Sequence, residues 1–374
     1  MYSESDLEAA VAGGVMTPEQ AAGFRNFVAA GQHSPAVDEE HFRLLTGFND
    51  IFVGIAAAIL LAAVGMIGYY VPPHIDGDGP TPFIGLFVAV TAWGLAEFFT
   101  RQRRMALPSI ILLIAFAGGV FAATVFGIVT SLGEDFFNNN AQAAAIVFAV
   151  GAAVAAAAAW LHWRRFRVPI TVSVGVAAAV ALVLGLIASA LIGNGDNITD
   201  AEGERIQHVL EGCALVLGIG TFLLAMWWDG SDPKRETRRS DVAFWLHLLA
   251  APLIVHPIFS LLGLTEGNTS TLDGVAVILL YVVLGLVALA IDRRALLVSA
   301  LAYVLYALNS LFETYGVVEL NVALTALIIG SALLLLSAFW ANARRTVVKP
   351  LPDTLKGRLP VLDRVQAVAM PAAA

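Results

Sequence analysis

Acidic and histidine side chains inside apolar stretches are the residues of this sequence best suited to chemistry. Glu211 and His208 are three residues apart, so they share one face if their segment is a helix. His256 lies between Pro252 and Pro257, and each proline removes one backbone hydrogen-bond donor from a helix. A carboxylate beside a histidine is suited to binding a proton or a cation, because each group shifts the pKa of the other.

Asn309 and Glu313 add polar side chains at a comparable depth in a later apolar stretch. At a rise of ~1.5 Å per residue, Glu211 and His256 fall in the outer third of their segments. Ionisable side chains at membrane depth are costly and mark candidate functional sites. We therefore expect an outward-facing polar cavity in which Glu211 and His256 bind a proton or a cation. The alternative is a fringe of polar side chains that hydrogen-bond between helices or contact headgroup water.

A metal site built from His208, Glu211 and His256 is conceivable, because imidazole and carboxylate groups bind zinc and iron. Their spacing matches no recognised metal motif, so we predict neither a metal nor a cofactor. The sequence also contains no phosphate-binding loop, nucleophile elbow or HExxH motif. We therefore predict no enzymatic activity.

The elements that position these residues follow from the composition of the chain. Hydrophobic residues make up 59% of the 374 residues and charged residues 13%, whereas soluble domains have about 45–50% and about 25%. A soluble chain of this size cannot bury so many apolar side chains in one core. The composition excludes a soluble enzyme, a disordered protein and a disulfide-stapled secreted domain, which would also need more than the single Cys213.

Ten apolar runs between residues 51 and 340 each have about the ~20 residues needed to cross a bilayer. Backbone groups must pair internally in lipid, so the runs are predicted to be helices. The predicted fold class is all-α, a polytopic membrane protein with about ten transmembrane helices. The predicted spans are 51–71, 83–100, 107–132, 141–163, 168–192, 206–228, 242–264, 273–291, 295–315 and 319–340.

The basic residues predict the orientation of the chain. All lysines and arginines except Arg205 lie on the side of the N-terminus, given ten spans. The positive-inside rule then places both termini in the cytoplasm. The formal net charge of -8 argues against a nucleic-acid partner, and the bilayer is the expected partner.

Three regions are predicted: a cytoplasmic helical hairpin over 1–47, a transmembrane domain over 48–343 and a flexible cytoplasmic tail over 344–374. In the hairpin, Ser5 is a candidate cap for a short helix ending at Gly13. Thr17, Pro18 and Gln20 predict the N-cap, the first helical position and the capping-box residue of a second helix. The hairpin is expected to dock on the basic connections or on a protein partner. The alternative is a soluble lead-in without an activity of its own.

Several residues of the spans have structural interpretations. Glu97 precedes Arg101 by four residues and predicts an ion pair. His162, between Trp160 and Trp163, is predicted to lie in an interfacial aromatic belt. Small residues predict close packing between helices, and the alternative is a homo-oligomer interface. The positions are Gly118-Gly119, Gly151, Gly212, Gly218 and Gly220. Weak repetition leaves both parallel hairpins and an inverted five-plus-five arrangement open, and no pattern assigns an oligomeric state.

The N-terminal region resembles a known kind of sequence. Residues 7–20, Leu-Glu-Ala-Ala-Val-Ala-Gly-Gly-Val-Met-Thr-Pro-Glu-Gln, and residues 38–50 before the first span resemble an uncharacterised family of bacterial multi-pass membrane proteins. That family places a short helical segment before a long series of membrane helices. The resemblance implies a location in the bacterial inner membrane and carries over no functional residue.

Two functional hypotheses follow. The first is a transporter or permease for an unidentified small solute, proton-coupled through Glu211 and His256. It predicts a water-accessible cavity that reaches Glu211 and the middle of the membrane. The second is a non-transporting scaffold or sensor that engages a protein partner through residues 1–47. It predicts a bundle without such a cavity.

Overall fold

The computed structural model describes most of the chain. The described residues are 4–31, 48–133, 140–193, 199–232, 237–261, 271–294, 296–297, 301, 304–305, 321–357 and 359–360. Over these ranges the chain forms helices, turns and irregular connections, with no strand. The predicted all-α fold class is therefore confirmed for the part of the chain that the structure describes.

Two short helices, α1 (Glu4–Ala12) and α2 (Pro18–Gly31), precede the long ones. The predicted capping box is present: the Thr17 amide donates to Gln20 Oε1 at 2.8 Å, and the Gln20 amide donates to Thr17 Oγ1 at 3.2 Å. Hydrogen bonds from its own backbone amide and from Thr17 lower the pKa of Glu19 in the same turn. Ser5 lies inside α1 instead of capping it, because the helix already includes Glu4.

Among the described residues, seven helices are long and apolar enough to cross a membrane. They are α3 (Phe48–Tyr69), α4 (Pro82–Ala96) with its π-helical continuation η1 (Glu97–Gln102), α5 (Ala106–Leu132), α7 (Ala141–Phe166), α8 (Ile170–Ile192), α9 (Asp200–Gly230) and α10 (Arg238–Leu261). Large apolar side chains on their outer faces are exposed, including Met66 at 64% and Leu223 at 60%. Such faces require lipid contact, so the chain is a multi-pass membrane protein.

The last helices depart from the predicted straight spans. Helix α11 (Thr271–Ile291) is followed, after residues that include 306–320 outside the described part, by α13 (Asn321–Ala338) and α14 (Trp340–Val348). The axes of α13 and α14 differ by 75° across Phe339, and counting this pair as one span gives eight. The short helix α15 (Asp353–Lys356) follows. The predicted run 319–340 is thus bent near its end, and most of the run 295–315 lies outside the described residues.

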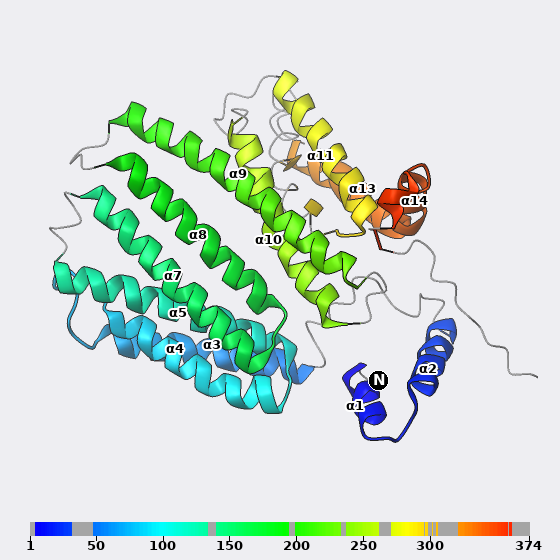
Figure 1. The fold of residues 1–374 in the computed structure, drawn as a ribbon, viewed down its shortest axis with the longest axis horizontal. Coiled ribbons are helices and arrows are strands. Elements are labelled where there is room, and N and C mark those ends of the chain that lie inside the picture. Colours follow the sequence, from blue (N-terminus) through cyan, green and yellow to red (C-terminus); the bar gives the residue numbers. More distant parts are fainter. Residues whose placement is uncertain are drawn as a thin grey trace, which may run out of the picture.

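The membrane helices pack mainly as consecutive neighbours. Figure 1 shows α7, α8, α9 and α10 side by side, with α3, α4 and α5 grouped beyond α7 and with α11, α13 and α14 on the opposite side of α9 and α10. Short connections between antiparallel helices explain this order.

Small residues allow the closest approaches between helices, and this confirms the prediction for some of the glycines named above. Gly119 of α5 lies against the backbone of Gly85 in α4, and Gly151 of α7 lies against Phe121 of α5. The prediction is wrong for Gly118, Gly212 and Gly220, where an added Cβ atom would meet no described atom within 4 Å.

The predicted ion pair at Glu97 is confirmed and extends to a second helix. Arg101 approaches Glu97 Oε2 at 3.3 Å. Arg165 at the end of α7 donates to both carboxylate oxygens, at 2.7 and 2.8 Å. The Glu97 carboxylate therefore joins η1 to α7 at the basic side of the molecule, defined here as the ends that carry the arginine-rich connections.

The interpretation of His162 as part of an aromatic belt is wrong. Its side chain is fully buried, and its ring packs against Trp93, Phe116 and Phe166. Its Nδ1 lies 3.2 Å from Thr171 Oγ1. Burial follows from the alanine-rich face of α7, which lets neighbouring helices approach the ring.

Candidate functional site

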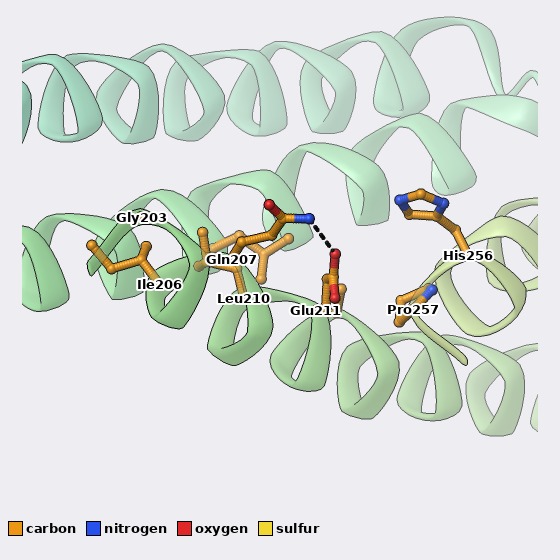
Figure 2. Close-up of a pocket in the computed structure, with 9 residues that line it drawn as sticks. Gly203, Ile206, Gln207, Leu210, Glu211, His256 and Pro257 are labelled. Carbon is orange, nitrogen blue, oxygen red and sulfur yellow. Dashed lines mark hydrogen bonds between the residues drawn. The ribbon is translucent and has the colours of Figure 1, made fainter. Parts of the chain in front are cut away.

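A pocket of about 350 Å³ lies where α8, α9 and α10 meet (Figure 2). Most of its lining is apolar, and its polar side chains come from three residues. The apolar lining residues are Leu184, Gly203, Ile206, Leu210, Ala214 and Pro257, and the polar ones are Gln207, Glu211 and His256. The pocket surface is therefore almost entirely hydrocarbon, and an acid and a histidine are among the residues that line it.

Helix α9 sets the position of Glu211. The helix begins with a capping box in which the Thr199 amide donates to Glu202 Oε2 at 3.0 Å and the Glu202 amide donates to Thr199 Oγ1 at 3.3 Å. Glu211 follows the first helical residue, Asp200, by a rise of ~16 Å. Seven residues separate it from Gly218, which packs against α10, so Glu211 lies on the α10-facing side of α9.

The two carboxylate oxygens of Glu211 have different surroundings. Its Oε1 accepts hydrogen bonds from Gln207 Nε2 at 2.9 Å and from Ser260 Oγ of α10 at 2.6 Å. Its Oε2 is buried and has no hydrogen-bond partner among the described residues. The residue as a whole is 8% exposed. One oxygen is thus satisfied by the protein, and the other has no donor among the described residues.

His256 reaches the same pocket from α10, as predicted, and interacts electrostatically with Glu211. Figure 2 shows its ring across the pocket from the Glu211 carboxylate. The hydrogen bonds to that carboxylate come instead from Gln207 and Ser260. Pro257 is buried and His256 is exposed, because successive helical residues point in different directions.

The other predicted site residues do not line this pocket in the described structure. His208 is exposed on α9, one residue along from Gln207 and outside the pocket lining. Asn309 and Glu313 lie outside the described residues. Over the described ranges, no three His, Cys, Asp or Glu side chains form a group that could hold a metal ion, so His208, Glu211 and His256 are not brought together for one.

A second polar cluster, which no sequence pattern predicts, lies at the basic side of the same helices. Arg293, which follows α11, is 1% exposed. Its guanidinium donates to both oxygens of Asp229 on α9, with Nε at 3.2 Å from Oδ2, and to the Ser240 carbonyl at 3.2 Å. His247 Nε2 on α10 lies 3.0 Å from Asp229 Oδ2. We call Asp229, Ser240, His247 and Arg293 the Asp229 cluster.

A neighbouring set of contacts attaches the C-terminal helices to this cluster. Trp340 Nε1 donates to Asp292 Oδ1 at 2.7 Å, and Arg344 Nε lies 3.7 Å from the same oxygen. Arg344 also donates to the carbonyl of Pro360 at 2.7 Å. Trp340, Arg344 and Val348 share the buried face of α14. These contacts account for the bend at Phe339, because they hold α14 across the end of α11.

The Asp229 cluster could have been suspected from two signals in the sequence. Asp229 ends an apolar run, and the pair Asp292-Arg293 ends another. Charged groups at such positions are ordinarily hydrated at the interface. Asp229 and Arg293 are 64 residues apart in the sequence, and only the packing of the helices shows that they are buried together.

The chain was compared with known protein families, curated proteins and solved structures. None of them matches.

Proposed function

We propose that the chain is a permease of the bacterial inner membrane that moves a small solute in a process coupled to protonation of Glu211. In this proposal the ten predicted runs form ten spans, and both termini are cytoplasmic. The described helices supply seven or eight of these spans. The arginine-rich connections support the orientation, because basic loops are retained in the cytoplasm.

The main support for this proposal is the environment of the Glu211 carboxylate. It lies on an apolar helix, is 8% exposed, and leaves one buried oxygen without a partner among the described residues. Such a group is expensive at membrane depth unless it binds a proton or a cation. The pocket beside it gives that ligand a place to bind, and His256 provides a second protonatable group there.

Proton flux in reconstituted vesicles tests this proposal. Full-length protein in phosphatidylcholine vesicles containing a pH-sensitive dye should dissipate an imposed pH gradient when solute is supplied as a cell-extract fraction of small metabolites. Glu211→Gln removes the titratable oxygen and should reduce the flux at least ~10-fold, towards that of empty vesicles. Glu204→Gln is the matched control, since Glu204 is exposed on the same helix outside the pocket lining. Equal flux in the two variants would contradict the proposal.

A scaffold or sensor remains the second candidate function, and the placement of the N-terminal hairpin favours it. Glu8 of α1 lies near Asp241 at the start of α10, close enough for the two acidic side chains to repel each other. Leu7 and Ala21 of the two short helices are buried. If the protein is such a sensor, the wild-type protein should give no proton flux. The same vesicle measurement therefore separates the two candidate functions.

A further inference from the structure

We infer that the Glu211 pocket binds a small organic cation, namely a protonated amine with an apolar body. This inference rests on the proposed function, since it names the class of solute that the permease would carry. It concerns binding alone, however, and can be tested without transport.

The charge of the ligand follows from the two oxygens of Glu211. Gln207 and Ser260 occupy Oε1 with two hydrogen bonds. Oε2 is buried without a partner among the described residues, and it belongs to a residue that lines the pocket. An ammonium group carries three donors and a positive charge, so it satisfies this oxygen with a charge-assisted hydrogen bond.

The side chains that line the pocket offer too few oxygen ligands for a simple metal cation. Calcium takes six to eight oxygen ligands, and magnesium requires an octahedral set. The side chains lining this pocket provide oxygens only from Glu211 and Gln207. An ammonium group needs far fewer acceptors, and a bare proton would need no pocket of about 350 Å³.

The apolar walls indicate the body of the ligand. Leu184 of α8, Leu210 and Ala214 of α9, and Pro257 of α10 surround the carboxylate with hydrocarbon. The volume of about 350 Å³ lies at the lower end of the range of small-molecule sites. Each methylene of the ligand that is buried against these walls should increase affinity about fourfold. A short alkyl or cyclic amine meets both requirements.

The experiment measures binding of hexylammonium and of 1-hexanol to the full-length protein in phosphatidylcholine nanodiscs, by saturation-transfer NMR at pH 7, with empty nanodiscs subtracted. Wild type should bind hexylammonium at least ~10-fold more tightly than 1-hexanol. Glu211→Gln should lose at least ~10-fold in affinity for hexylammonium, and the matched control Glu204→Gln should retain the wild-type value. Equal affinity for the amine and the alcohol, or equal affinity of the two variants for the amine, would overturn the inference.

A second variant keeps the test decisive if Glu211→Gln does not fold. Ala214→Phe places a ring in the pocket and leaves the carboxylate in position, so it should abolish hexylammonium binding. Retained binding in this variant overturns the inference. Amine binding without proton flux supports the inference and contradicts the proposed transport, whereas flux that depends on Glu211 without amine binding contradicts the inference alone.

Discussion

At the scale of single residues, Asp229 and Arg293 form the most strongly buried ionic contact described above. Both side chains are almost completely buried, and His247 and Ser240 complete their hydrogen bonds. A buried pair contributes little net stability compared with apolar residues, but removal of one partner leaves a buried charge uncompensated. The cluster therefore fixes which helices come together.

This asymmetry gives a prediction for the Asp229 cluster. Asp229→Ala should destabilise the folded protein by ~3–5 kcal/mol, because it leaves the Arg293 guanidinium buried without a carboxylate. The double variant Asp229→Ala/Arg293→Met should lose less than the sum of the two single variants, because it removes both charges. Unfolding in detergent micelles followed by circular dichroism measures both. Strict additivity would show that the two side chains do not act as a pair.

The chemistry at Glu211 was predictable at this scale only in part. An acid within an apolar run stands out in any sequence, but the pocket that Glu211 and His256 line is mostly apolar, unlike the polar cavity expected from the sequence. The hydrogen bonds from Gln207 and Ser260 were not predictable, because Ser260 is 49 residues away and its orientation depends on how α9 and α10 pack. Fully buried polar groups such as His247 escape notice for the same reason.

At the scale of elements, the pair α9–α10 has a close contact between its two polar regions. An added Cβ at Gly218 would lie 2.8 Å from the carbonyl oxygen of Leu253. Pro257 has no amide hydrogen, so the Leu253 carbonyl has no helical donor four residues on. Gly218 thus lets α9 pack directly against a stretch of α10 whose backbone hydrogen bonding is interrupted.

Adding one methyl group at this contact should separate the two helices. Gly218→Ala should lower stability by ~1–3 kcal/mol, because the new Cβ would meet backbone atoms that cannot move aside cheaply. Gly220→Ala, on the same helix with no described atom near its added Cβ, should be neutral or slightly stabilising. Thermal unfolding of the two variants in the same detergent compares them directly. A neutral Gly218→Ala variant would argue against close packing here.

The positions of the helices were the feature of this structure that the sequence predicted best. The predicted spans 107–132 and 141–163 agree closely with the observed helices Ala106–Leu132 and Ala141–Phe166. Apolar runs mark helices in membrane proteins because unpaired backbone groups are excluded from lipid. The 75° bend before Trp340 was not predictable from hydropathy, since the residues on both sides are compatible with a helix. It depends on the contact between Trp340 and Asp292, which no local pattern encodes.

At the scale of the whole molecule, the arrangement of charge makes a prediction about topology. With Cys213→Ser as a background, Thr354→Cys should react with a membrane-impermeant maleimide only after the cells that express the protein are opened. Ala201→Cys, at the start of α9, should react on intact cells. Both positions are exposed, so labelling reports the side of the membrane. Labelling of both from the same side would contradict the five predicted spans that separate Ala201 from Thr354.

The Asp229 cluster also orders the events of synthesis. Asp229 and His247 leave the ribosome well before Arg293, which follows Asp229 by 64 residues. During that interval the carboxylate at the end of α9 lacks its guanidinium partner. The Asp229 cluster is therefore complete only after the end of α11 has been synthesised. Trp340 and Arg344 then attach the last part of the nascent chain to Asp292.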